Sequence, residues 1–386
     1  MLENKGGRIG PTKLNNSTYS TRDAKSRFTS GNFAVVVPAE RDDGTKVALR
    51  FFLGKVPSHT TQIISHITNH PQIRGLVGCK MLRKLLPLKD GTEVDAMEMD
   101  YIEGRNLDDV VDSYITAGRA DDLTGIADHM FENVMGLLKT GFLHGDLSHG
   151  NVMIETATGA VRFVDYDSAV INSMDSKNLV GTLEEGHPNY HHPSRRGREL
   201  LTCDVLFSAL VIHVSLISLS RDPSLWAKFN KHVDGLLFRS ANDDLRDTDT
   251  DLWRSIKPLF INPGTGEMDP YIEPMQILEK CVRTKDLRNA SIESELETWW
   301  SVHTPGPNPV PAPIPDPNPN PKPNPVPPSP VPRPIDPYRP KPKPSPVPRP
   351  KEQRRTPRES PRPRPRTKRE LEEKERKPEG KRKGQE

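Results

Sequence analysis

The sequence predicts an α+β protein with a small β-rich lobe, a larger helical lobe and a disordered C-terminal tail. Three observations support this prediction. Runs of β-forming residues occupy the first part of the chain, and apolar residues recur at helical spacing after residue 106. In addition, 28 of the 40 prolines lie from Thr304 onward. Such a tail has few backbone donors and few large apolar residues, so it cannot form a core.

Charge divides the chain at the same place. Residues 304–386 contain 21 Lys and Arg against 10 Asp and Glu, a net +11, so the remainder carries 3 − 11 = −8. The part before the tail, about 300 residues, is long enough for one two-lobed domain. We therefore divide the chain into a flexible N-terminus at 1–25, a folded domain at 26–302 with lobes at 26–104 and 105–302, a Pro-rich polyproline linker at 303–350, and a basic, charged, disordered tail at 351–386.

The first lobe is predicted from its strands. Phe33–Val37 and Lys46–Phe52 are β-rich runs joined by Asp42-Asp43-Gly44-Thr45, which is a hairpin signal. Glu93–Tyr101 is a third β-rich segment. Residues 1–25 are polar and show no periodicity, so we expect a lead-in without regular structure.

The second lobe is predicted to be mainly helical. Apolar residues recur at helical spacing in two segments, Leu107, Val110, Val111 and Tyr114 in the first and Ile126, Met130, Val134, Leu137 and Leu138 in the second. Val205–Leu219 is apolar all round, as expected of a helix through the centre of a lobe, and helices continue from Ile256 to Trp300. Residues 151–154 and 161–164 flank Thr158-Gly159-Ala160 and predict a short hairpin within this lobe.

The most specific chemical feature is the loop His144-Gly145-Asp146-Leu147-Ser148-His149-Gly150-Asn151, with Asp165-Tyr166-Asp167 beyond the predicted hairpin. Transfer of a phosphoryl group from ATP requires a carboxylate that orients the acceptor hydroxyl and oxygen ligands for magnesium. Asp146 is the candidate catalytic base. Asn151 and Asp165 are candidate metal ligands, because Mg²⁺ prefers hard oxygen donors.

The order and spacing of these residues resemble the catalytic loop and metal-binding triplet of the protein-kinase superfamily. Gly186–Pro193 lies where protein kinases end their activation segment, and Cys203–Leu210 resembles the opening of their central helix. Together the motifs are similar to a bacterial branch of eukaryotic-like Ser/Thr protein kinases. The resemblance implies a two-lobed kinase-like fold, ATP and Mg²⁺ as cofactors, a protein hydroxyl as acceptor, and Asp167 as a further metal ligand. It also implies that Asp204 holds the catalytic loop, while capping of its own helix stays open as well.

The resemblance also indicates where a nucleotide lies. Val47-Ala48-Leu49-Arg50 corresponds to the family's Val-Ala-Ile-Lys, and strand alternation puts Ala48 and Arg50 on one face. Ala48 is then expected against adenine and Arg50 against the phosphates, while only Gly31 remains of the family's glycine-rich hairpin. The other candidate nucleotide contacts are Met99, Asp100 and Ile102 at the hinge and Met153 under the base.

The chain departs from the family at several of these positions. There is no Asp or Glu from Phe51 to Lys89, so the helix carboxylate that pairs with the strand cation in active protein kinases is missing. Gly145 replaces the Arg that binds a phosphorylated activation loop, and Ser148 replaces a Lys near the transferred phosphate.

Three functions remain open on the sequence. The first is an ATP-dependent protein Ser/Thr kinase. The second is a small-molecule kinase of the aminoglycoside and choline kinase type, which shares the extra acid at the position of Asp167. The third is a pseudokinase that binds nucleotide or acts as a scaffold. It is favoured by Arg50 in place of the family's Lys, by the missing helix Glu, and by the loss of all but one glycine from the glycine-rich hairpin.

The remaining features concern partners and compartment. The proline-rich segment is expected to be a stiff spacer or a ligand for an aromatic groove, and the basic tail suits an acidic partner. The tail lacks interleaved aromatic residues, so no specific nucleic-acid binding is expected. Three scattered cysteines favour a reducing compartment, and we expect a cytoplasmic protein without a signal peptide or transmembrane segment.

Overall fold

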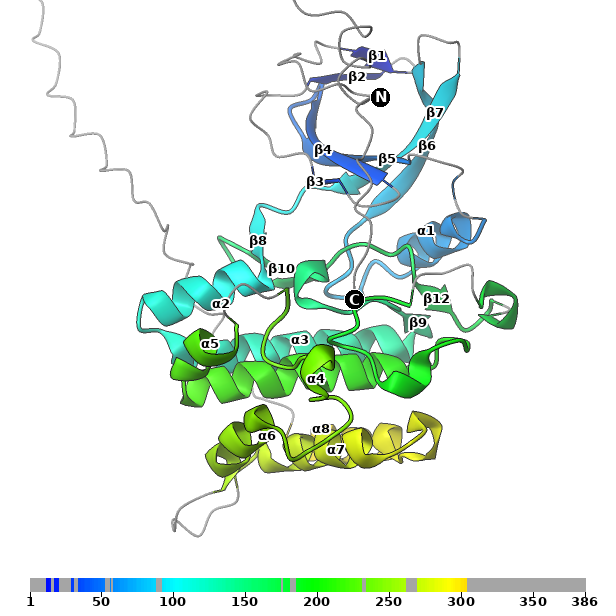
Figure 1. Ribbon diagram of the computed structural model, residues 1–386. Coiled ribbons are helices and arrows are strands. Elements are labelled where there is room, and N and C mark those ends of the chain that lie inside the picture. The colour runs from blue at the N-terminus through cyan, green and yellow to red at the C-terminus, as the bar shows by residue number, and fades with distance from the viewer. Residues whose placement is uncertain are drawn as a thin grey trace, which may run out of the picture. The chain divides into compact units, whose positions relative to one another are not determined.

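An antiparallel β-sheet near the N-terminus is followed by a mostly helical region in the computed structural model (Figure 1). The structure describes residues 12–14, 17–20, 29–30, 34–52, 56, 58–87, 92–174, 176–180, 185–230, 234–261 and 269–303. The predicted α+β class is therefore confirmed. Gly31 and the segment 304–386, which holds the predicted linker and basic tail, lie outside the described residues.

The N-terminal sheet has seven strands in the order β1-β2-β4-β5-β7-β6, with β3 paired to β4, and all its neighbours are antiparallel. The strands are β1 (Thr12–Leu14), β2 (Ser17–Ser20), β3 (Thr29–Ser30), β4 (Ala34–Arg41), β5 (Lys46–Phe52), β6 (Cys79–Pro87) and β7 (Glu93–Asp100). The predicted β4–β5 hairpin is confirmed. Its turn places Gly44 at φ +83°, a conformation that glycine adopts without strain.

Two parts of the sheet differ from the expectation. β1 and β2 lie within residues 1–25, where the sequence shows no periodicity, and β2 is ordered through pairing with β4. β6 was not predicted as a strand. It carries Lys80, Arg83 and Lys84, and its register with β7 is irregular between Leu82 and Leu86. In both cases long-range pairing decides the structure rather than a local pattern.

Helix α1 (Thr60–Asn69) follows β5 and packs against β6 and against β12 (Val170–Ile171) of the helical region. Its buried Ile63 and Ile67 belong to the large hydrophobic core of the helical region, whereas the sheet has a smaller core of its own. α1 contains no acidic residue. The sequence observation that the family's helix carboxylate is missing therefore applies to this helix.

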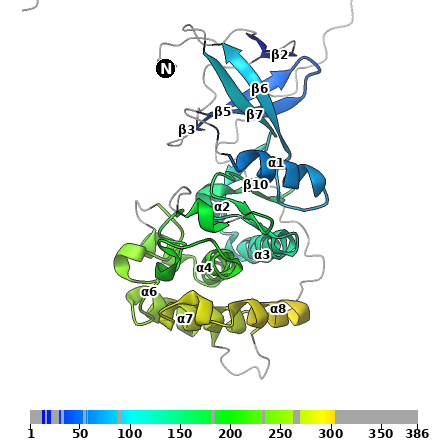
Figure 2. The same ribbon diagram turned by 90° about the vertical axis from the view of Figure 1, so that its right-hand side faces the viewer.

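The helical region is built around α3 (Leu123–Lys139) and α4 (Thr202–Arg221), which lie side by side (Figures 1 and 2). α4 is long and apolar enough to cross a membrane by length and composition alone, but 94% of its most apolar window is buried inside the protein. It is thus packed as a central core helix, as its sequence predicts. The other helices are α2 (Leu107–Thr116), α5 (Ser224–Phe229), α6 (Asp251–Ile256), α7 (Ile272–Arg283) and α8 (Ile292–His303).

Short strands within the helical region support the loops that carry the candidate site. β10 (Val152–Glu155) and β11 (Val161–Phe163) form the predicted hairpin, and β8 (Gly104–Asn106) pairs with β10. β9 (Phe142–Leu143) pairs with β12. The loop 144–151 therefore begins at the end of β9 and ends at the start of β10, while Asp165 lies just beyond β11.

Candidate functional site

The loop 144–151 is tied to the end of β11. His144 is fully buried, and burial lowers its pKa, so its neutral imidazole donates from Nε2 to the Val164 carbonyl oxygen (3.1 Å). Gly145 has φ +79°, and a Cβ there would lie 1.9 Å from the Ser168 carbonyl oxygen. Only glycine fits this position, because any side chain would overlap the Ser168 backbone.

Both oxygens of the Asp146 carboxylate are held by donors. The Asn151 side-chain amide donates from Nδ2 to Asp146 Oδ2 (2.9 Å), and the His187 backbone N–H donates to Asp146 Oδ1 (2.8 Å). Asn151 Nδ2 also donates to the Asp146 carbonyl oxygen (2.8 Å). The candidate base and one candidate metal ligand are thus brought together, with the carboxylate in a fixed orientation.

A hollow of about 640 Å³ opens beside Asp146. It is lined by residues 148–151, by residues 185–187 and by Asp234. A Cβ on Gly150 would meet no atom within 4 Å, whereas a Cβ on Gly186 would lie 2.7 Å from Asp146 Oδ1. The two glycines therefore differ in role, because Gly186 permits close approach to Asp146 and Gly150 leaves space in the hollow.

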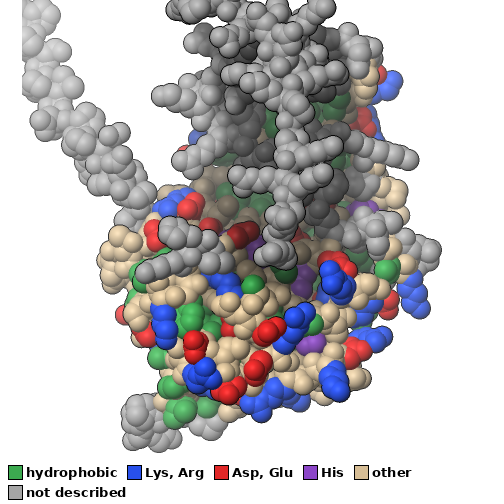
Figure 3. All heavy atoms as spheres, viewed as in Figure 1, with side chains coloured by type: hydrophobic (Ala, Val, Ile, Leu, Met, Phe, Trp, Pro, Cys, Tyr) green, Lys and Arg blue, Asp and Glu red, His purple; other side chains and the backbone are tan. Residues whose placement is uncertain are grey.

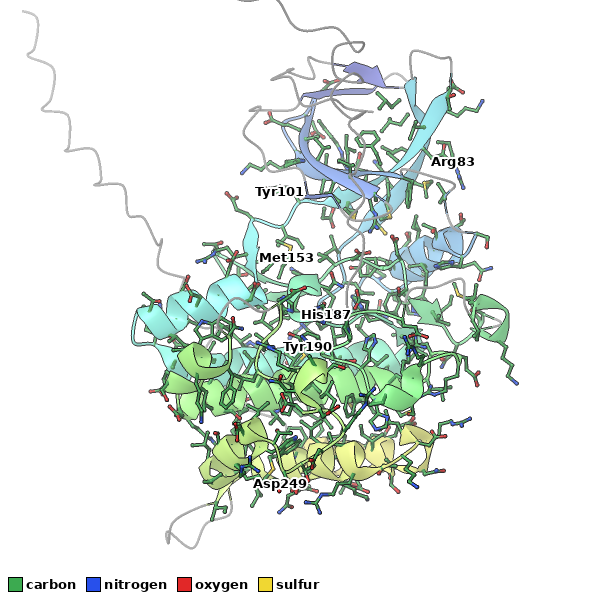
Figure 4. All side chains as sticks on the ribbon, in the orientation of Figure 1. Arg83, Tyr101, Met153, His187, Tyr190 and Asp249 are labelled. Atoms are coloured by element: carbon green, nitrogen blue, oxygen red, sulfur yellow. The ribbon has the colours of Figure 1, made fainter. Side chains whose placement is uncertain are left out.

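Two histidine side chains, His149 and His187, line this hollow, and the buried Tyr190 ring packs against both. The rings of His187 and Tyr190 lie 5.3 Å apart, and both are labelled in Figure 4. His149 and His187 each contact the Asp234 carboxylate through Nε2, at 2.9 and 3.1 Å. The sequence indicated the segment that contains His187 and Tyr190, but it gave no signal for Asp234, which lies far from both histidines along the chain.

Asp165 adopts the left-handed conformation with φ +64°. This is uncommon for a residue other than glycine and marks a position held by its surroundings. Its side chain is 47% exposed, and its Oδ1 accepts from Arg50 Nη1 (3.0 Å). The geometry directs the Asp165 carboxylate to the strand that carries the candidate phosphate-binding cation.

Arg50 has two carboxylate partners, Asp165 and Asp167, the second contacted through Arg50 Nη2. Helix α1 supplies no carboxylate, but Arg50 is paired nonetheless, since its partners lie 115 and 117 residues away along the chain. His59, at the start of α1, contacts the Asp167 carbonyl oxygen through Nε2 (3.0 Å). The Arg50 Nε is buried and meets no hydrogen-bond acceptor among the residues that the structure describes.

The three candidate metal ligands come from two segments, Asn151 at the end of the loop 144–151 and the two aspartates just beyond β11. Among the residues that the structure describes, no group of three or more His, Cys, Asp or Glu side chains is placed to hold a metal ion. Asn151, Asp165 and Asp167 contribute one amide and two carboxylates, and both carboxylates are paired with Arg50. This set suits Mg²⁺, which is commonly bound by one or two carboxylates together with substrate phosphates, better than a metal with a dedicated protein cage.

The candidate nucleotide contacts are only partly brought together. Ala48 and Met99 are direct partners in the pairing of β5 with β7, and Arg50 is two residues further along β5. The Asp100 N–H donates to the Gly78 carbonyl oxygen (2.9 Å), so this N–H is not open to a base. Ile102 is half-buried just after β7, and Gly31 lies outside the described residues.

Met153, the predicted floor under the base, lies in β10 opposite Asn106 and Arg162. It is half-buried and belongs to a different sheet from Ala48 and Met99. In the view of Figure 4 it lies between Tyr101, which follows β7, and His187, whose backbone N–H contacts Asp146 of the loop 144–151.

Asp204 caps its own helix. Its Oδ2 accepts the Leu201 N–H (2.9 Å), and both carboxylate oxygens accept from the Arg198 guanidinium at 2.6 and 2.7 Å. The structure shows the capping role that the sequence left open. The hydrogen bonds of Asp204 stabilise the start of α4 and do not reach the loop 144–151.

Comparison with models of known protein families yields no match to this chain, and a search among curated proteins finds no relative.

Proposed function

We propose that the chain has a two-lobed protein-kinase-like fold and is an ATP-dependent phosphotransferase that transfers the γ-phosphate of ATP to a protein hydroxyl. The N-terminal sheet with α1 corresponds to the smaller lobe in this proposal, and the region from α2 to α8 to the larger one. The separate hydrophobic clusters of the sheet and of the helical region support this division.

The proposal rests on the orientation of the Asp146 carboxylate and on its position beside the hollow. Its carboxylate is oriented through both oxygens, by Asn151 and by the His187 backbone, at the edge of a hollow large enough for a peptide side chain. A carboxylate held in this way next to open space is placed to accept a proton from a hydroxyl that enters the hollow. Each oxygen keeps a lone pair for an acceptor hydroxyl.

The reaction then assigns a task to each residue. The oxygen of the acceptor hydroxyl forms a bond to the γ-phosphorus, and Asp146 accepts the proton that this hydroxyl loses. At the same time the bond between the γ-phosphorus and the ADP oxygen breaks, and its electron pair leaves with ADP. Arg50 binds phosphate oxygens through its guanidinium. Asn151, Asp165 and Asp167 hold Mg²⁺, which when bound neutralises charge on the phosphates.

Transfer of radiolabelled phosphate from ATP to the chain itself and to a generic protein tests this function. We expect labelling by the wild type and its loss in Asp146→Asn and in Asp165→Ala, with folding checked by circular dichroism. Labelling that persists in both variants would show that the loop and the triplet do not perform the chemistry.

A pseudokinase is the second candidate, and one observation favours it. Arg50 occupies both carboxylates of the triplet, so Mg²⁺ has to share or displace this ion pair. A thermal-shift titration separates the two functions. A wild-type chain that is stabilised by ATP with Mg²⁺, and yet transfers no phosphate to any acceptor, would be a nucleotide-binding pseudokinase.

A further inference from the structure

Asp234 presents a fixed negative charge in the hollow beside Asp146. Its side chain is 78% exposed, although both its oxygens contact histidines. Partial burial acts to raise its pKa, but hydrogen bonds and other electrostatic interactions with the His187 and His149 rings outweigh this and lower the pKa. Asp234 therefore remains ionised at neutral pH and stays accessible to a ligand.

The hydrogen-bond network shows that the two histidines supply dipoles rather than full charges. Tyr190 Oη accepts the Leu236 N–H (2.9 Å), so its proton is donated to His149 Nδ1 (2.9 Å). His149 Nδ1 consequently carries no proton. His187 Nδ1 accepts the Asn189 N–H (3.2 Å), so it carries no proton either. Each ring donates its single N–H to Asp234.

The lining of the hollow is thus negative. Its described carboxylates are Asp146, Asp234 and Glu185, and only Glu185 is matched by a nearby cation, with its Oε2 at 3.7 Å from Arg196 Nε. Ser148, where the resembled family has a lysine, adds no positive charge. The face in Figure 3 shows acidic, basic and histidine side chains together at the surface of the helical region. A hydroxyl that enters this hollow fits best when its neighbours are cationic.

The C-terminal tail of the same chain contains hydroxyls of this kind. Thr356 follows Arg354-Arg355, Ser360 lies between Arg358 and Arg362, and Thr367 lies between Arg366 and Lys368. Thr356 is 356 − 303 = 53 residues beyond the last helix, a length that spans on the order of 170 Å when fully extended. Chain length therefore does not prevent the tail from reaching the hollow.

We propose that the hollow takes a Ser or Thr flanked by Lys or Arg, that Asp234 selects for the flanking cation, and that the hydroxyls of 354–369 are its acceptors. This inference rests on the proposed phosphotransfer. The acceptor hydroxyl gives its proton to Asp146, its oxygen gains the γ-phosphorus, and ADP departs with the electron pair of the broken bond. Each transfer adds negative charge to the tail, which weakens its attraction to the hollow and releases it.

Peptide kinetics test the role of Asp234. The probes are a peptide of residues 351–369 and the same peptide with every Lys and Arg replaced by Ala, each with ATP and Mg²⁺. For Asp234→Asn in the full chain we expect KM for the basic peptide to rise about tenfold, equivalent to roughly 1.4 kcal/mol, with little change in kcat and no change for the Ala peptide. Asp243→Asn is the matched control, because Asp243 is an exposed aspartate outside the hollow.

A charge reversal gives the stronger test. Asp234→Lys should favour a peptide whose cations are replaced by Glu over the basic peptide. Mass spectrometry of the full chain after incubation with ATP should find phosphate on Thr356, Ser360 or Thr367. Equal use of basic and Ala peptides by the wild type would overturn the inference while leaving the phosphotransfer intact, and phosphate only at sites outside 354–369 would overturn the tail assignment. Absence of transfer to every acceptor would instead count against the proposed function.

Discussion

Removal of the Asp167 charge should loosen the link between the N-terminal sheet and the loop after β11. Asp167→Asn keeps the shape of the side chain but removes its ion pair with Arg50. The Arg50 side chain is 6% exposed, whereas Asp167 is 27% exposed. Breaking a buried pair costs about 3–5 kcal/mol, and an exposed pair contributes about 0–1 kcal/mol. Because Asp167 is partly solvated and Asp165 still contacts Arg50, we expect a loss of about 2 kcal/mol.

Urea unfolding followed by far-UV circular dichroism measures this loss directly. In a thermal scan, about 2 kcal/mol corresponds to a decrease in Tm of roughly 4–8 °C for a domain of this size. The matched control is Glu103→Gln, since Lys46 on the same strand pairs with Glu103 and the two side chains are 59% and 78% exposed. That substitution should cost less than about 0.5 kcal/mol.

A double-mutant cycle identifies the partner. If Arg50 is what makes Asp167 stabilising, Asp167→Asn should cost far less in an Arg50→Met background than in the wild type. Equal costs in the two backgrounds, or a loss no larger than that of Glu103→Gln, would refute the reasoning.

Two further predictions concern the neighbourhood of Asp146. Gly145→Ala should destabilise the fold by more than about 2 kcal/mol, because its Cβ would overlap the Ser168 carbonyl oxygen. Gly118→Ala, which has φ +68° but open space around it, should cost only about 1 kcal/mol in the same urea assay and so isolates the backbone strain. Burial lowers the pKa of His191 from 6.5 to about 4, so stability is full above pH 6.5 and falls as the pH drops toward 4. Between pH 7 and pH 5 this amounts to about 2 kcal/mol, which His191→Gln should abolish in urea unfolding measured at both pH values.

The parts of the fold that the sequence predicts are those with a strong local pattern. Val205–Leu219 is apolar on every side, so its helix and its burial follow from composition, and α4 is indeed the central helix. The β4–β5 hairpin likewise follows from two β-rich runs and a glycine turn. By contrast, β6 carries Lys80, Arg83 and Lys84, and its strand depends on pairing with β7.

The residues of the candidate site also fall into two groups, those that a local sequence pattern predicts and those that depend on long-range contacts. The sequence places Asp146 and Asn151 close together because only four residues separate them, and the structure joins them by hydrogen bonds. It could not predict Asp234, whose role depends on His149 and His187 from distant segments. Nor could it predict the ion pairs of Arg50, because the absence of an acid on the following helix says nothing about carboxylates that approach from elsewhere in the fold.

Arg50 also connects stability with nucleotide binding. Its guanidinium is held by two carboxylates in the structure, and the proposed function asks the same group to bind phosphate. If the carboxylates only position Arg50, Asp167→Asn lowers both the free energy of unfolding and the affinity for metal-free ATP. If they compete with phosphate, the same substitution lowers stability but raises that affinity, since coupling between two ligands of one group is reciprocal. The sign of the change in ATP affinity, measured without Mg²⁺, therefore shows whether the two carboxylates position Arg50 for phosphate or compete with phosphate for it.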